Sequence, residues 1–251
     1  MPASASACQF EPAGAGNVSA IIDGRSFVLD DGREVRLAGI EVPFPPAPGE
    51  TGPRAAAGSA ARAALDSILA GQSIELRQRT PALDRYGRTV AHVYVTSEGR
   101  GRSVAHEMLA TGYARVAALV GDRACAAELL ARERAARQAR LGLWGEPYYA
   151  ILAAESGAAL LAERGHFTVV EGKVLSVRES GGTIYMNFGR RWSEALTVTV
   201  PKRQERAFSA AGLAPKALES RRVRVRGWVE QRNGPRIEAT SPEQIEIADR
   251  N

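Results

Sequence analysis

Two Asp-Gly turns near the N-terminus constrain the fold more than any other feature of this sequence. They separate three stretches in which apolar and polar residues alternate, 18–22, 26–29 and 34–37. Alternating stretches joined by Asp-Gly turns are typical of antiparallel hairpins. Two more such stretches follow at 73–78 and 89–95. We therefore expect five short strands that wrap into a small OB-type barrel.

Helical patterns lie between and after these strands. They cover 53–70, 103–111 and 124–139, and the first begins at a proline and ends before Gly71, as helices commonly do. Residues 17–147 are thus expected to form one domain of five strands and three helices.

A second β-rich region begins near residue 166. Strands are expected at 168–177, 183–188, 196–200, 222–230 and 236–239, with a helix at 202–210. This is again the order of an OB-type barrel. The fold class predicted is α+β: two five-stranded barrels (17–147 and 166–251), an Ala-rich linker helix (148–165) and a flexible N-terminal tail (1–16).

Charge is distributed unevenly. The chain of 251 residues carries a net charge of +5, and the part from residue 151 onward holds 16 basic and 12 acidic residues. This balance allows nucleic acid or another polyanion as a partner, and equally a basic protein without one. No apolar run reaches the ~18 residues of a transmembrane segment.

The N-terminus points to export. Ala5-Ser6-Ala7 has the small-x-small pattern that ends a secretory signal peptide, so a periplasmic location is expected. In an oxidising compartment the two cysteines, Cys8 and Cys125, favour a disulfide. The alternative is a lipidated Cys8, although Ala5 is unusual at the position where lipoproteins carry leucine.

Several motifs in order make the first domain resemble the staphylococcal nuclease (thermonuclease) family. They are Asp23-Gly24, Arg36-Leu-Ala-Gly-Ile-Glu-Val-Pro43, Gly52-Pro53, Asp84-Arg-Tyr-Gly-Arg88, Gly112-Tyr-Ala-Arg-Val116 and Leu141-Gly-Leu-Trp144. The resemblance implies calcium-dependent hydrolysis of phosphodiesters. It assigns Arg36 and Arg88 to the phosphate, which guanidinium groups bind through paired hydrogen bonds.

The sequence departs from the family at the metal and base positions. The first aspartate of the calcium site is replaced by Arg25, and the second by Glu41; the threonine between metal and base is Val42. The general base, which would take a proton from water, is replaced by Phe44. A cation at a ligand position repels calcium, so we expect no cofactor and no calcium site.

Two readings of the remaining site residues stay open. Arg25 could hold the phosphate in place of calcium, with Glu41 or Glu50 activating water. Alternatively, Glu41 pairs with Arg25 or Arg36, and the arginines are structural ion-pair partners.

The nucleotide-binding positions are also mixed. Arg85-Tyr86 matches the family's lysine-tyrosine pair, but the two tyrosines that pack on the nucleotide are replaced by Ala118 and Val120. Stacking in this pocket should therefore be weak.

In the second domain, Arg190-Arg191-Trp192 occupies a turn, and Arg222, Arg224 and Arg226 share one face of a strand. These six residues are candidates for nucleic-acid binding; the alternative is a solvated charged face.

The sequence predicts a thermonuclease-family protein that binds nucleic acid or another polyanion, with calcium-dependent hydrolysis lost or impaired. An active metal-independent nuclease is one alternative. The other is a scaffold subunit of an envelope protein assembly, with a protein partner.

Overall fold

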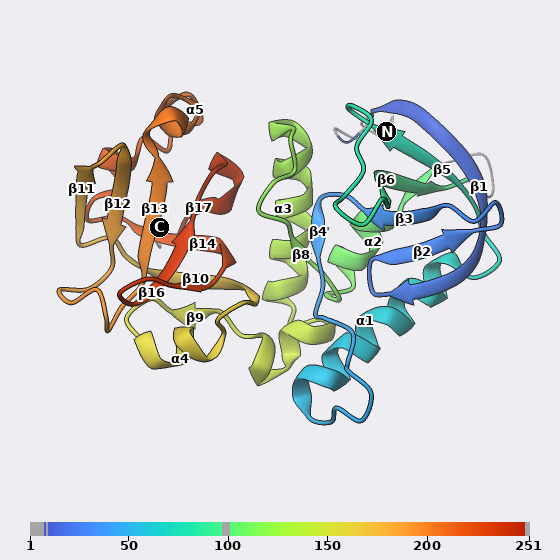
Figure 1. Cartoon of the computed structure of the whole chain (residues 1–251), viewed down its shortest axis with the longest axis horizontal. Coiled ribbons are helices and arrows are strands. Elements are labelled where there is room, and N and C mark those ends of the chain that lie inside the picture. The colour runs from blue at the N-terminus through green and yellow to red at the C-terminus, as the bar shows by residue number, and fades with distance from the viewer. Residues whose placement is uncertain (1–7, 9, 97–100, 249–251) are drawn as a thin grey trace. The chain divides into compact units, whose positions relative to one another are not determined.

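The computed structural model describes residues 8, 10–96 and 101–248 (Figure 1). The chain divides into two compact units. The N-terminal unit extends to Tyr149, apart from Ala117–Leu119, and the C-terminal unit holds those three residues and the chain from Ala150 onward. Each unit has its own hydrophobic core.

A closed barrel of five strands forms the N-terminal unit, as expected. The strands are β1 (Glu11–Asp23), β2 (Ser26–Leu29), β3 (Glu34–Leu37), β5 (Ser73–Gln78) and β6 (Thr89–Val95). They pair in the order β3-β2-β1-β5-β6, and a parallel pairing between β3 and β6 closes the ring (Figure 1). Alternate apolar side chains such as Phe27, Val35 and Leu76 point into the core.

The first strand begins earlier than the sequence predicts. Residues 1–16 are expected as a flexible tail, but β1 starts at Glu11 and pairs with β5 from Glu11 to Asn17. Residues 11–17 lack apolar alternation, and all of them except Gly16 are exposed. Residues 1–7 and 9 lie outside the described part of the chain.

Helices cover the barrel. They are α1 (Pro53–Leu69), α2 (Val104–Ala110) and α3 (Arg123–Gln138). Helix α1 packs on β1 and α2, and α2 packs on α3. Short strands complete the unit: β4 (Ile40–Glu41) pairs with β8 (Arg115–Val116), and β7 (Arg102–Ser103) pairs with β6.

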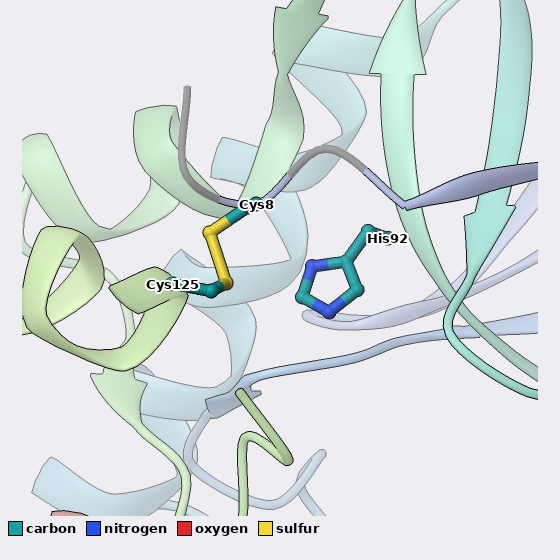
Figure 2. Close-up of side chains that lie close together, drawn as sticks. All are labelled: Cys8, His92 and Cys125. Carbon is teal, nitrogen blue, oxygen red and sulfur yellow. A yellow bond between two sulfur atoms is a disulfide. The ribbon is translucent and has the colours of Figure 1, made fainter. Parts of the chain in front are cut away.

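A disulfide ties the N-terminal segment to α3. Cys8 and Cys125 are bonded and fully buried, and the ring of His92 lies beside them (Figure 2). The predicted pairing is therefore present. The Asp122 carboxylate caps α3 by accepting a hydrogen bond of 2.8 Å from the Cys125 amide, which fixes the start of the helix that carries the cysteine.

Two sheets share the core of the C-terminal unit. One contains β9 (Leu152–Ala153), β10 (Phe167–Lys173), β14 (Arg222–Trp228) and β17 (Ile245–Ile247). The other contains β11 (Ser176–Ser180), β12 (Thr183–Asn187), β13 (Thr197–Pro201), β15 (Glu230–Gln231) and β16 (Pro235–Glu238). Helices α4 (Gly157–Ala162) and α5 (Glu205–Ala210) complete it, with 3₁₀ turns at Lys202–Gln204, Pro215–Leu218 and Pro242–Gln244.

Two expectations for this region are wrong. The stretch 168–177 is not one strand, because the chain passes from β10 in the first sheet to β11 in the second. The linker helix at 148–165 is also absent. A 3₁₀ turn at Pro147–Tyr149, strand β9 and helix α4 stand in its place, because β9 pairs with β10 and so leaves the helical path.

Candidate functional site

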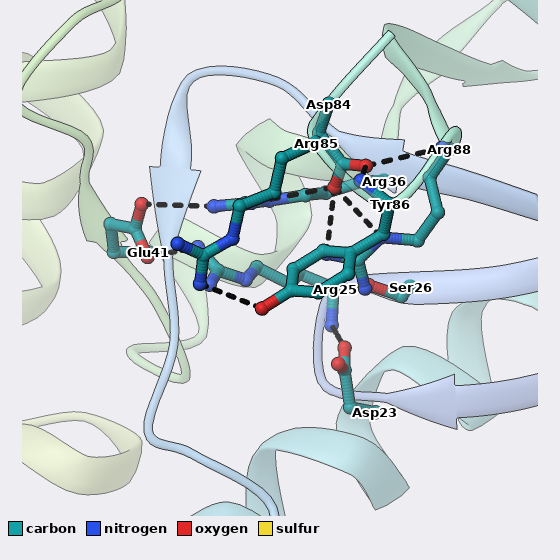
Figure 3. A network of polar contacts seen from close by, with 9 residues as sticks. All are labelled: Asp23, Arg25, Ser26, Arg36, Glu41, Asp84, Arg85, Tyr86 and Arg88. Atoms are coloured by element: carbon teal, nitrogen blue, oxygen red, sulfur yellow. Dashed lines mark hydrogen bonds and ion pairs between the residues drawn. The ribbon is translucent and has the colours of Figure 1, made fainter.

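The barrel brings together the residues that the family resemblance singles out (Figure 3). Arg25 lies in the turn between β1 and β2, Arg36 on β3 and Glu41 on β4. Asp84 and Arg88 lie in the loop before β6. We call these five residues the arginine cluster.

Both oxygens of the Glu41 carboxylate contact guanidinium groups. Oε2 pairs with Arg25 and Oε1 accepts a hydrogen bond of 3.3 Å from Arg36. Burial raises the pKa of Glu41, while the charges of Arg25 and Arg36 oppose that rise. Burial likewise lowers the pKa of Arg25, although its ion pair with Glu41 favours the charged form. The Arg25 amide also bonds to the Asp23 carboxylate at 2.8 Å.

The second acid of the cluster is Asp84. Arg88 Nε donates to its Oδ2 at 2.8 Å, and the Tyr86 amide donates to its Oδ1 at 2.9 Å. Arg36 lies 3.7 Å from the same carboxylate. Burial disfavours the charge, but these hydrogen bonds outweigh it and lower the pKa of Asp84 to about 2. The carboxylate is therefore ionised at neutral pH and holds both family arginines.

An exposed edge adjoins the cluster. Tyr86 is 66% exposed, and the guanidinium carbons of Arg85 and Arg88 lie 4.8 and 5.2 Å from its ring centroid. Arg85 also donates to the Tyr86 hydroxyl at 2.6 Å. One aromatic face and two guanidinium groups are thus held together at the surface (Figure 3).

Phe44 follows the cluster on a loop that presses on α1. Gly58 of α1 makes this possible, because a Cβ there would lie 2.0 Å from the Phe44 carbonyl oxygen. The Phe44 side chain is 44% exposed. Glu50, the other acid considered for activating water, instead accepts a hydrogen bond of 2.9 Å from the Ala47 amide in its own loop.

Two groups of potential metal ligands surround the disulfide, Cys8 with His92 and Cys125, and Cys8 with His106 and Glu128. Their cysteine sulfurs are bonded to each other, so neither is the thiolate that a metal requires. Burial lowers the pKa of His92 to about 4, helped by the nearby His106. These residues belong to the core.

The arginine row of β14 differs from the prediction. Arg222 and Arg224 donate to the two oxygens of Glu171 at 2.9 and 2.6 Å. Arg226 is 1% exposed and pairs with Glu246 at 2.5 Å. The prediction that Arg226 lies on the same accessible face as Arg222 and Arg224 is therefore wrong. Glu171 lies opposite Arg224 on β10, and Glu246 lies beside it on β17, partners that the strand's own alternation does not reveal.

Arg190, Arg191 and Trp192 do not act as one group either. Arg191 pairs with Glu194 at 2.9 Å. Arg190 and Trp192 instead line a groove of about 1090 Å³ over the second sheet. The groove also contains residues that the sequence did not single out as binding residues, Arg178, Tyr185, Arg232 and Arg236. Their signal in the sequence is the alternation of β11 and β12, which places Arg178 and Tyr185 on the outer face.

Comparison with known proteins agrees with a nuclease-like barrel in the N-terminal unit. Residues 34–146 match the family described as staphylococcal nuclease homologue. Protein ParB of Escherichia coli is 33% identical over 139 residues, which are 53% of this chain and 73% of that protein. The chain belongs to the staphylococcal nuclease homologue family. The family match ends inside the N-terminal unit and includes Arg36, Glu41, Phe44 and Arg88.

The structure also bears on the membrane. Among the helices of the described residues, none has both the length and the apolar character needed to cross a bilayer.

Proposed function

We propose that this protein binds nucleic acid or another polyanion and has lost the calcium-dependent hydrolysis of its family. One observation carries the proposal. The Arg25 guanidinium pairs with the Glu41 carboxylate, and the family resemblance aligns these two residues with the two metal-binding aspartates. The ligand pair of the family is replaced by an ion pair.

The residues present do not fit calcium. The ion takes six to eight oxygen ligands, mostly carboxylate and carbonyl. Here Glu41 directs both oxygens to Arg25 and Arg36, and a dication would stand next to two guanidinium groups. The nearby carboxylates of Asp23 and Asp84 are themselves engaged, with the Arg25 amide and with Arg36 and Arg88, so they do not offset the repulsion between a dication and these guanidinium groups.

The general base is missing as well. Phe44 cannot accept a proton, and Glu50 bonds to its own loop. Loss of cooperating catalytic groups lowers kcat by several powers of ten. Binding can persist without hydrolysis, because Arg85 beside the exposed Tyr86 offers charge and an aromatic ring at the surface.

The first test is a nuclease assay on single-stranded DNA and RNA, with calcium and with EDTA. We expect no calcium-dependent cleavage and no rise in Tm on adding calcium, since a ligand that binds the folded state would stabilise it. Calcium-dependent cleavage would contradict the proposal. Cleavage that resists EDTA and disappears in Arg88→Ala would instead support the metal-independent nuclease.

A reciprocal variant tests the cause. Arg25→Asp with Phe44→Glu restores a carboxylate at both altered positions, so calcium should raise its Tm. The matched control is Arg25→Ala with Phe44→Ala, which removes the same side chains but adds no ligand. Equal responses of the two double variants to calcium would rule out Arg25 as the reason for the lost site.

We also propose that the C-terminal unit is an OB-type barrel and that the protein is exported to the periplasm. The first is supported by two sheets that share one core, with the chain passing directly from β10 to β11 and from β14 to β15. The second is supported by the buried disulfide, since such bonds persist in oxidising compartments. Thiol labelling of protein from a periplasmic extract, with and without reductant, tests it: cysteines that react without reductant would contradict it.

A further inference from the structure

The outer face of the second sheet in the C-terminal unit carries a row of polar and aromatic side chains. On β12, Ile184 and Met186 point into the core, so Tyr185 and Asn187 point outward. The pairing register sets Arg178 opposite Tyr185, and it sets Asn187 opposite Thr197, which in turn lies opposite Arg236. Directly opposed side chains lie within reach of each other.

Two turns border this face. One carries Arg190 and Trp192, and the other carries Arg232 and Asn233. The turns are packed together at Gly234, whose φ is +140°; a Cβ there would lie 1.9 Å from the Trp192 carbonyl oxygen. Only glycine allows this approach. The backbone that carries Trp192 is therefore held in place, while its ring is 66% exposed.

The groove that these turns border is basic. Its lining includes four arginines and, among the described residues, no aspartate or glutamate. Arg236 pairs with Glu230 at 2.6 Å. Arg178, Arg190 and Arg232 have no ion pair within 4.0 Å in the part of the chain that the structure describes. Arg178 does interact electrostatically with Glu219, so Arg190 and Arg232 are the guanidinium groups best placed to attract a phosphate backbone.

We propose that this groove binds single-stranded nucleic acid, with bases stacking on Trp192 and Tyr185 and phosphates meeting Arg178, Arg190 and Arg232. Stacking on the exposed Trp192 and the half-buried Tyr185 needs unpaired bases, because a duplex hides its base faces. The inference concerns the C-terminal unit and stands apart from the arginine cluster.

The experiment measures fluorescence anisotropy of labelled 12-mers of thymidine and of uridine with the full chain in EDTA. Two matched pairs of variants separate groove from surface. Trp192→Ala should weaken binding about ten-fold or more, whereas Trp228→Ala, whose ring packs on Phe167, should change it less than about two-fold. Arg190→Ala should weaken binding and reduce the slope of log K against log salt by about 0.7. Arg191→Ala, adjacent but paired with Glu194, should leave that slope unchanged.

Further probes identify the ligand chemistry. A 12-mer duplex and an abasic 12-mer should both bind more weakly than oligothymidine, and Trp192→Phe should retain much of the affinity that Trp192→Ala loses. Equal affinity for the abasic strand, or tighter binding of heparin than of oligothymidine, would overturn the proposal in favour of a general polyanion site. The proposal would also be overturned if none of the single strands bound.

A variant of the other unit keeps the two proposals distinguishable. Loss of oligothymidine binding in Arg85→Ala but not in Trp192→Ala would overturn the groove and leave the proposed function standing. If the unmodified protein cleaved in a calcium-dependent manner and Trp192→Ala still lost oligothymidine binding, the proposed function would be overturned and the groove would stand.

Discussion

The arginine cluster of the barrel and the groove of the C-terminal unit use the same side chain in opposite ways. In the cluster, Arg25, Arg36 and Arg88 each contact Glu41 or Asp84. In the groove, Arg190 and Arg232 have no such acid within 4.0 Å among the described residues. The neighbouring carboxylates, and not the number of arginines, distinguish a network that holds a fold from a surface that attracts an anion.

This difference has an energetic reason. A guanidinium that is largely buried needs a partner, because an uncompensated buried charge costs several kcal/mol. An arginine at the surface keeps its hydration and needs none. The cluster therefore contributes to the stability of the barrel, whereas the groove is free to use its charge on a ligand.

The largest effect is expected from the disulfide, which is found in the N-terminal unit. The Cys8→Ser, Cys125→Ser variant opens a loop with a sequence separation of 117 residues, and should lower the free energy of unfolding by about 4 kcal/mol. Denaturant unfolding with and without reductant measures this. The groove should still bind oligothymidine under conditions that melt the barrel; loss of both together would show that the units unfold as one.

The next largest effect is expected from a variant that leaves arginines of the cluster without a carboxylate partner, as in the groove. Glu41→Gln leaves Arg25 and Arg36 without their shared carboxylate, so it should destabilise the barrel by about 3 kcal/mol. The same change should increase the barrel's affinity for inorganic phosphate. Thermal unfolding with and without phosphate measures both, with Glu50→Gln as the control. Unchanged stability in Glu41→Gln would mean that the cluster is not structural.

A pH dependence should belong to the barrel as well. His92 has a folded pKa of about 4, against ~6.5 when unfolded. Between these values the unfolded state binds a proton that the folded state does not. The contribution of neutral His92 to the free energy of unfolding is therefore fully present above pH 6.5. As the pH falls to 5, the free energy of unfolding decreases by about 2 kcal/mol. His92→Gln should flatten the curve of stability against pH in that range, and His166→Gln should not; parallel curves for His92→Gln and the unmodified chain would exclude His92 as the cause.

The smallest effect concerns the groove. Arg190→Ala removes an exposed charge without an ion pair, so stability should change by less than about 0.5 kcal/mol. Any change should favour the variant at low salt, because like charges repel across the groove. Urea unfolding at two salt concentrations measures this. A marked loss of stability would place Arg190 with the structural arginines of the barrel.

The sequence predicts the barrel well where turns and alternation coincide. Strands β2, β3, β5 and β6 have the expected bounds, because each is a short run of strand-forming residues flanked by turn residues in the sequence. Strand β1 begins before the apolar alternation in its sequence does. Its first part, Glu11–Asn17, pairs with β5 through backbone hydrogen bonds, which the side-chain pattern does not predict. The Ala-rich stretch after Pro147 favours a helix locally, but pairing of Leu152 with Val170 overrides that preference.

The two sites differ in the same way. The cluster could be placed from motifs, because each residue follows a recognisable turn or strand. The groove could not, because Arg178, Tyr185 and Arg236 meet only through the register of four strands. Likewise, Arg226 is buried because it pairs with Glu246. Glu246 lies on β17, a strand of three residues that is too short to show alternation in the sequence.

The closing seam of the barrel, where β3 pairs with β6, gives Arg36 and Arg88 a structural role that does not depend on catalysis. Strand β3 carries Arg36, strand β6 follows Arg88, and their parallel pairing is the last contact that turns a sheet into a ring. Asp84 contacts both arginines across that seam. Amide hydrogens on either side should therefore exchange with solvent faster whenever the network is broken. Selection for a closed ring would retain Arg36 and Arg88 whether or not the protein cleaves phosphodiesters.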